Sequence, residues 1–175
     1  MRLKPGTRAP DFTADVWNGT TLKLSDYAGK RVWLAFFRYA SCPLCNLRVH
    51  DIIRRHDEFT SKGVQVLAVF QSPKESISGY VGKQAPPFPL ISDPEEKLYR
   101  IYGLESGLGA YLSPGNLPHL ARAAKEGFMS TYSEGTRTRI PGDFLIGPDG
   151  VIQAVFYGEK ISDHIPFETV EKWMG

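Results

Sequence analysis

Short apolar runs alternate along the chain with segments whose apolar residues recur at helical spacing. A continuous apolar run predicts a buried strand, and helical spacing predicts a helix packed on it. The expected strands are residues 31–37, 64–70, 90–91, 144–146 and 151–157. The expected helices are residues 43–61, 74–83, 93–102 and 167–174. This alternation predicts an α/β fold with a central sheet flanked by helices.

Turn residues set the ends of several of these elements. An Asn-Gly pair inside residues 15–24 predicts an N-terminal hairpin. A Pro-Asp-Gly turn at residues 148–150 predicts a second hairpin, formed by the last two strands. Asp93 followed by Pro94 resembles a helix start, because aspartate caps a helix and proline suits its first position.

Residues 104–139 are the least regular part of the chain. Glycine and serine dominate there, and only residues 118–126 have a helical pattern. We expect residues 104–139 to be an insertion that packs over one end of the sheet, just before the last hairpin. The whole chain, residues 1–175, is expected to fold as one domain.

Composition and charge narrow the possible partners. The chain is 42% hydrophobic and carries a formal net charge of +2, with its basic residues spread rather than clustered. We therefore expect no nucleic-acid partner and no membrane partner. The longest apolar run, residues 32–37, is too short to span a bilayer. No apolar segment follows the basic start at residues 1–6, so a cytoplasmic location is expected.

The candidate chemistry lies in two cysteines, Cys42 and Cys45, which follow the first buried strand. Pro43 suits the first position of a helix, which makes Cys42 the expected N-cap. Its sulfur then meets unpaired backbone N–H groups and the positive end of the helix dipole, and both stabilise a thiolate. Cys45 lies one turn further on, within reach of Cys42. The pair suits one attacking and one resolving sulfur that form a reversible disulfide.

A structural role for the cysteines is the alternative. A Cys-x-x-Cys pair can be half of a zinc site. The other half would have to come from histidines such as His50 and His56, which do not have the i, i+4 spacing of a helical ligand pair. A disulfide across so short a loop would also constrain the unfolded chain only weakly. Redox chemistry without a metal or other cofactor is therefore favoured.

Several motifs together resemble a known family. They are residues 6–12, 29–30, 36–37, 42–45, 92–94, 102–103 and 141–150. They are similar to the AhpC/TSA peroxiredoxin family and to related thioredoxin-like reductases, over nearly the whole chain outside residues 104–138. The resemblance implies a thioredoxin-like fold with a mixed sheet.

The resemblance also implies an activity. It suggests a thiol–disulfide oxidoreductase of the antioxidant type, which reduces disulfides or peroxides and is reset by an external thiol reductant such as a thioredoxin or glutathione system. The alternative from a different class is a non-catalytic thioredoxin-fold binding module whose cysteines are structural or bind a metal.

Two alignments assign the attacking sulfur differently. Aligned with thioredoxins, Cys42 attacks and Cys45 resolves. Aligned with peroxiredoxins, Cys45 takes the place of the peroxide-attacking cysteine, Cys42 that of a threonine and Arg38 that of a proline. We predict that Cys42 attacks, because it should be the more exposed sulfur and the one with the larger thiolate fraction.

Further residues are candidates for supporting roles. Arg38 could steady a thiolate, and Ser41 and Pro43 belong to the motif itself. Pro141 matches the cis-proline that faces the dithiol in thioredoxin-like proteins, so we predict a cis Ile140–Pro141 bond beside Cys42.

The remaining polar candidates receive weaker assignments. Arg137 and Arg139 lie near the place of the family's downstream arginine. Phe36 stands where thioredoxins carry a buried acid, and no carboxylate is an obvious proton acceptor for Cys45. His56 is expected in the core, and His119 and His164 on the surface.

Overall fold

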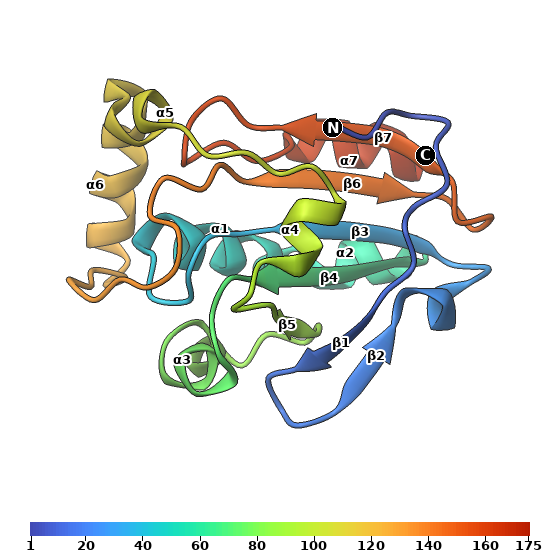
Figure 1. Ribbon diagram of the computed structural model, residues 1–175, viewed down its shortest axis with the longest axis horizontal. Helices are drawn as coiled ribbons and strands as arrows, with labels where there is room; N and C mark the ends of the chain where they lie inside the picture. The colour runs from blue at the N-terminus through green and yellow to red at the C-terminus, as the bar shows by residue number, and fades with distance from the viewer.

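The computed structural model describes residues 1–175 and contains one seven-stranded sheet, in the order β2-β1-β5-β4-β3-β6-β7 (Figure 1). Its strands are β1 Thr13–Val16, β2 Thr21–Lys23, β3 Arg31–Phe36, β4 Val64–Phe70, β5 Leu90–Ser92, β6 Gly142–Ile146 and β7 Ile152–Tyr157. Strands β3, β4 and β5 are parallel, and the other pairings are antiparallel. The predicted mixed sheet and both hairpins are confirmed.

Helices cover both faces of this sheet. The α-helices are α1 Pro43–Arg54, α2 His56–Ser61, α3 Lys74–Gly79, α4 Lys97–Ile101, α5 Leu108–Leu112, α6 Leu117–Lys125 and α7 Phe167–Met174. Short 3-10 helices are η1 Leu24–Tyr27, η2 Val81–Gln84 and η3 Pro114–Asn116. Figure 1 shows α4 in front of the sheet and α1, α2 and α7 behind it.

The central strand β3 is buried on both sides because its apolar residues serve two cores. Trp33 and Ala35 belong to the core under α1, α2 and α7, whereas Leu34 and Phe36 belong to the core under α4. A strand covered on both faces reads as a continuous apolar run, which is why the sequence identified β3 so clearly.

The register of β3 places the redox motif at one edge of the sheet. Phe36 pairs with Val69 of β4 on one side and with Gly142 of β6 on the other. The chain then turns through residues 37–42 and enters α1. The cysteines therefore lie at the carboxyl end of a central strand, with β4 and β6 as rigid neighbours.

The helix predicted over residues 43–61 is two helices, because the helical backbone is interrupted at Arg55. The backbone there leaves the helical region, with φ −112° and ψ 5°. The Arg55 guanidinium forms ion pairs with Glu58 and with Glu171 of α7. The apolar periodicity continues through the break, so the pattern alone did not reveal it.

The helix predicted to begin near Asp93 begins four residues later, at Lys97. Asp93 still caps it: its carboxylate accepts hydrogen bonds from the N–H groups of Lys97 (2.9 Å) and Leu98 (2.7 Å). Between them the chain makes a turn in which Glu96 has φ +54°. The predicted N-cap and helix start were therefore wrong: the N-cap position is Glu96, and Asp93 accepts the first N–H groups from before the turn.

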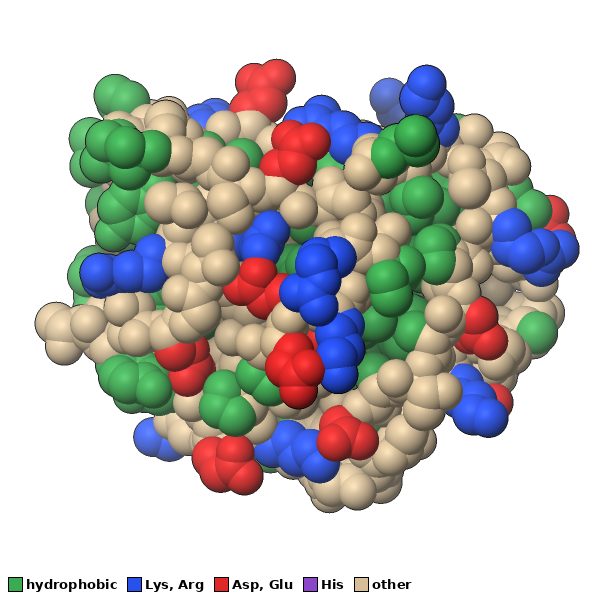
Figure 2. Space-filling view, in the orientation of Figure 1, with side chains coloured by type: hydrophobic (Ala, Val, Ile, Leu, Met, Phe, Trp, Pro, Cys, Tyr) green, Lys and Arg blue, Asp and Glu red, His purple; other side chains and the backbone are tan.

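The segment predicted as an insertion, residues 104–139, contains α5, η3 and α6 and then an extended stretch. Helix α6 packs against α1, and Arg122 donates to both carboxylate oxygens of Asp51. Figure 2 shows apolar side chains gathered over α5 and α6, where Leu108, Leu112 and Leu117 are exposed. None of the protein's helices has the length and apolar character needed to cross a membrane.

Candidate active site

The strand-to-helix junction has the local geometry that the sequence predicts. Cys42 is the N-cap of α1 with an extended backbone, and Pro43 is the first helical residue. Both cysteines are free thiols. Their exposure differs from expectation, because Cys42 is as deeply buried as Cys45, at 0% and 1% exposed. The expected difference in access between the two sulfurs is wrong.

Arg38 is the residue that distinguishes the two sulfurs. Its Nη1 donates to Cys42 Sγ at 3.2 Å, and its backbone N–H donates to Cys45 Sγ at 3.4 Å. The side chain is only 2% exposed, and its guanidinium lies over the rings of Tyr39 and Tyr111. A buried cation needs a compensating negative charge. The nearest group able to supply it is a thiolate at Cys42.

The electrostatics favour ionisation of Cys42. Burial by itself raises the pKa of Cys42, but the hydrogen bond from Cys45, the charge of Arg38 and the N–H groups of Cys45 and Leu44 outweigh it and lower the pKa to about 6. Burial and the hydrogen bond to Cys42 raise the pKa of Cys45 well above its ordinary value. At neutral pH the pair therefore carries one thiolate, on Cys42, and one thiol.

Three residues that sequence reasoning missed hold the turn before Cys42. Asn46 Nδ2 donates to the carbonyls of Ala40 (2.8 Å) and Cys42 (3.0 Å). Gln84 Nε2 donates to Asn46, and Tyr99 OH donates to the Phe37 carbonyl at 2.8 Å. Asn46 gave a sequence signal, as a polar residue on the buried side of α1. Gln84 and Tyr99 gave none, because tertiary folding brings them to the turn.

The stretch after α6, residues 130–138, forms a strap that packs on the turn before Cys42. The Tyr132 carbonyl accepts a hydrogen bond from Ser41 Oγ (2.8 Å), and the Thr136 carbonyl accepts one from Gln71 Nε2 (2.8 Å). The Arg137 carbonyl accepts one from Arg38 Nη2. The strap is thus hydrogen-bonded to Arg38 and Ser41 of the turn before Cys42, and to Gln71 after β4.

Pro141 departs from the prediction, since the protein has no cis peptide bond and Ile140–Pro141 is trans. Pro141 directly precedes β6, and its carbonyl accepts a hydrogen bond from Gly158 N–H at 3.0 Å. A proline at the start of a strand needs no donor there, so the favoured trans bond is accommodated without cost.

The two arginines near the downstream position do not reach the sulfurs with their side chains. The Arg139 guanidinium is buried in an ion pair with Glu96 and also donates to the Leu104 carbonyl. The Arg137 side chain is exposed, and only its backbone carbonyl enters the site, where Arg38 binds it.

His164, expected on the surface, has a side chain that is only 5% exposed. Its Nδ1 lies 3.2 Å from Oδ2 of Asp143, and its ring packs on Phe37. Asp143 is completely buried and also accepts hydrogen bonds from Trp33 Nε1 and the Ile165 N–H. The protein therefore has a buried acid, on β6, but the oxygens of this carboxylate are already bonded.

The structure gives a zinc site no further ligands. No group of three or more histidine, cysteine, aspartate and glutamate side chains lies together in an arrangement that could hold a metal ion. His50 lies near Glu126 and the Phe128 ring, and His56 packs against Phe88. His119, as expected, is exposed.

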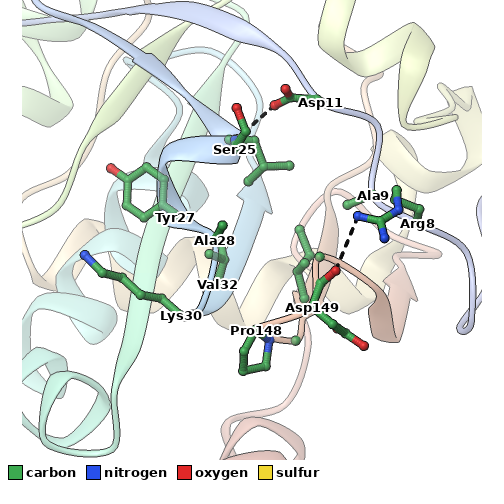
Figure 3. Close-up of a pocket in the computed structure, with 14 residues that line it drawn as sticks. Arg8, Ala9, Asp11, Ser25, Tyr27, Ala28, Lys30, Val32, Pro148 and Asp149 are labelled. Atoms are coloured by element: carbon green, nitrogen blue, oxygen red, sulfur yellow. Dashed lines mark hydrogen bonds between the residues drawn. The ribbon is translucent and has the colours of Figure 1, made fainter.

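Two cavities lie at opposite ends of the sheet. A cavity of about 380 Å³ adjoins the motif and is lined by residues that include Ser41, Asn46 and Tyr80. Figure 3 shows the other, of about 220 Å³, between Val32 at the start of β3 and the turn at residues 147–150. The cysteines follow the far end of β3, so the cavity of Figure 3 lies away from them.

Comparison with known proteins identifies the family of the chain. Residues 5–155 match the family model described as the AhpC/TSA family. The chain is 28% identical to "Peroxiredoxin Bcp" of Escherichia coli (strain K12) over 172 residues, which is 98% of this chain and 96% of that protein.

Solved structures show the same fold. "Peroxidoxin BcpB" of Mycobacterium tuberculosis superposes with a TM-score of 0.71 at 17% identity, over 99% of this chain and 95% of that one. "Peroxiredoxin Q" of Xanthomonas campestris gives a TM-score of 0.68 at 21% identity, over 93% and 89%. The thioredoxin-like fold expected from the sequence is confirmed.

Proposed function

The chain belongs to the AhpC/TSA family of peroxiredoxins, which are antioxidant thiol enzymes, and from this premise we propose that it reduces hydroperoxides with Cys42 as nucleophile and Cys45 as resolving thiol. The observation that carries the proposal is the 3.2 Å contact between Arg38 Nη1 and Cys42 Sγ at the start of α1. A buried guanidinium on that sulfur and not on a carboxylate supports a stored thiolate at neutral pH.

In the first step the Cys42 thiolate attacks the terminal oxygen of the hydroperoxide. The S–O bond forms as the O–O bond breaks, and the alkoxide or hydroxide leaves and takes a proton from solvent. Cys42 is oxidised to the sulfenic acid, and the peroxide is reduced to an alcohol or water. Arg38 remains beside the reacting sulfur and is placed to donate to the oxygen as negative charge develops on it.

In the second step Cys45 attacks the Cys42 sulfenic acid. The S–S bond forms, and the hydroxyl group leaves as water with the proton of the Cys45 thiol. The N-cap and first-turn positions of the two residues suit a disulfide without a large movement of the backbone. Two electrons have then passed from the dithiol to the peroxide.

An external thiol reductant returns the enzyme to its dithiol form. We propose a thioredoxin or glutathione system for this step, because the chain has only two cysteines and both are in the disulfide. Such systems maintain reduced thiols in the cytoplasm, and we propose that the protein works there. Burial of both sulfurs favours a small peroxide over a protein disulfide as the oxidant.

The test is stopped-flow reaction of the reduced protein with hydrogen peroxide, beside the Cys42→Ser and Cys45→Ser variants. We expect the unaltered protein and Cys45→Ser to react at similar rates, with a sulfenic acid persisting in Cys45→Ser, and Cys42→Ser to be inert. Full reactivity of Cys42→Ser would show that Cys45 attacks first. Inert unaltered protein that reduces insulin disulfides would show a disulfide reductase instead.

A further inference from the structure

The strap over residues 130–138 is fastened by one carboxylate that the chemistry above does not use. Glu134 accepts hydrogen bonds through Oε1 from Ser72 Oγ and through Oε2 from Ser76 Oγ (2.8 Å) and Tyr132 OH (3.2 Å). Its partners are thus three hydroxyl groups rather than a cation. The position of this carboxylate therefore depends on hydrogen bonds from hydroxyl groups at and before α3 and in the strap itself, and not on an ion pair.

Glu134 is connected to the turn that carries the nucleophile. Ser72 Oγ, which donates to Glu134, also accepts a hydrogen bond from the Ala40 N–H at 2.8 Å. Ala40 lies between Arg38 and Cys42, in the turn that ends β3. One continuous chain of hydrogen bonds therefore runs from the strap to the residue two positions before the reactive sulfur.

The strap fits closely on the surface beneath it. The Tyr132 ring stacks on Tyr80, with centroids 5.6 Å apart and planes at 5°. Gly135 has φ +61°, and a Cβ there would lie 3.0 Å from Gln71 Nε2 and 3.1 Å from the Gln71 carbonyl oxygen. A larger residue at 135 would strain the backbone at this positive φ and crowd Gln71, so we expect it to loosen the strap.

We propose that the strap is a cover that selects reagents by size, and that Glu134 is the positioning residue that keeps it closed. The inference rests on the proposed function. Both sulfurs are buried while the strap is in place. On this proposal the reduced site admits molecules of the size of hydrogen peroxide and excludes bulky hydroperoxides and protein thiols. The external reductant reaches the disulfide only when the strap lifts.

Oxidation of Cys42 weakens the attachment of the strap through Arg38. Arg38 joins Cys42 Sγ to the Arg137 carbonyl of the strap. Disulfide formation removes the negative charge from that sulfur, and the buried guanidinium loses its counter-charge. An unpaired buried charge is costly and moves toward water, which weakens the hold on the strap. The cover is therefore closed over the dithiol and looser over the disulfide.

The first experiment alkylates the reduced protein with iodoacetamide, which is small, and with a fluorescein maleimide, which is bulky. In Glu134→Ala we expect the bulky reagent to react about ten- to a hundredfold faster, the factor for losing hydrogen bonds to a charged group. The iodoacetamide rate should change much less. Gly135→Ala should act in the same direction, and Glu134→Gln, which keeps one acceptor oxygen, should lie between.

Glu105→Ala is the matched control, because Glu105 is an exposed glutamate outside the strap whose carboxylate pairs with Arg2. The measured quantity is the ratio of the alkylation rate with the bulky reagent to the rate with the small one. A change in the reactivity of the thiolate would alter both rates alike, so only a change in access to the sulfur alters the ratio. If Glu134→Ala is unstable, Gly135→Ala provides the same comparison. An unchanged ratio in the variants that fold would overturn the role of the strap.

The second experiment uses the exposed Arg137 side chain as a trypsin site within the strap. We expect cleavage after Arg137, identified by mass spectrometry, to be about tenfold faster in the disulfide form than in the dithiol form, because cleavage requires local opening. Equal rates would refute the redox coupling. Size-dependent alkylation in a protein that reduces no peroxide would contradict the proposed function but would still support the role of the strap as a cover.

Discussion

At the scale of single residues, the buried guanidinium of Arg38 is the group that distinguishes the two sulfurs of the site. Arg38 contacts Cys42 Sγ with one nitrogen and the strap with another, and its backbone N–H contacts Cys45 Sγ. Helix-end N–H groups add to the same effect at the N-cap. In the proposed mechanism the nucleophile is therefore selected by charge and not by exposure, since both sulfurs are equally buried.

We predict that Arg38→Met slows peroxide reduction at pH 7. The rate should rise with pH through the pKa of Cys42, about 6, as the thiolate forms. Without the guanidinium that pKa moves upward; a shift to about 8 would lower the thiolate fraction at pH 7 about tenfold. The measurement is thiolate ultraviolet absorbance against pH, together with stopped-flow rates.

Arg137→Met is the matched control for this substitution. It removes the same charge from an exposed side chain whose backbone carbonyl alone enters the site. Its titration midpoint should equal that of the unaltered protein. If both variants titrate alike, the Arg38 guanidinium does not set the ionisation of Cys42.

The residues that could be predicted from the sequence are those whose role is local. Cys42 and Pro43 define a helix start within the chain itself, and the structure has that start. His164 and Asp143 could not be predicted, because they meet only when the loop before α7 packs on β6. The trans bond at Pro141 likewise depends on how the chain enters β6.

The buried Asp143 gives a second prediction, about stability. Burial opposes its ionisation, but the charge and hydrogen bond of His164, the charge of Arg48 and the Ile165 N–H outweigh it and lower the pKa of Asp143. A carboxyl whose pKa is lowered in the folded state contributes stability above its unfolded pKa, and that stability is lost as the pH falls through the folded value.

We therefore expect Asp143→Asn to lower the free energy of unfolding by roughly 3 kcal/mol at pH 7, since one partner of a buried charged network is lost. The difference from the unaltered protein should shrink as the pH falls below about 4. Urea unfolding followed by tryptophan fluorescence measures both. A constant difference across that pH range would mean that the pKa of Asp143 is the same in the folded and unfolded states.

At the scale of elements, sequence patterns identified strands better than helix boundaries. The strands β3 and β4 are apolar throughout and bury both faces, so their pattern is unambiguous. Helix limits depend on tertiary contacts, as at Arg55, where ion pairs to Glu58 and Glu171 accompany the break. The strap lacked any periodic pattern, and its position over the site follows from hydrogen bonds that no pattern predicts.

The start of α4 supplies a prediction at this scale. Asp93 accepts two hydrogen bonds from the first N–H groups of the helix. Asp93→Ala should reduce the free energy of unfolding by about 1 kcal/mol, the usual value of such a cap, and Asp93→Asn by less, because the amide oxygen replaces one of the two carboxylate oxygens that accept these hydrogen bonds. Urea titration of both variants tests the cap; equal losses would show that charge, not hydrogen bonding, is responsible.

At the scale of the whole molecule, the cysteine site and the cavity of Figure 3 lie at opposite ends of β3. The cysteines, Arg38 and the strap lie beyond its carboxyl end, and the cavity of Figure 3 lies at its amino end. Both cysteine sulfurs come from one chain, with Cys42 at the N-cap of α1 and Cys45 in its first turn. No second protein chain is required between peroxide attack and disulfide formation.

This arrangement predicts that the conversion of sulfenic acid to disulfide is first order and independent of protein concentration. After one equivalent of peroxide, the protein should lose two hydrogens in mass, run as a monomer without reductant and recover both thiols on reduction. Cys45→Ser is the control: its sulfenic acid has no internal partner and should either cross-link between chains or oxidise further with excess peroxide. A resolution rate that rises in proportion to protein concentration would instead show that a second molecule resolves Cys42, and the assignment of Cys45 would have to be abandoned.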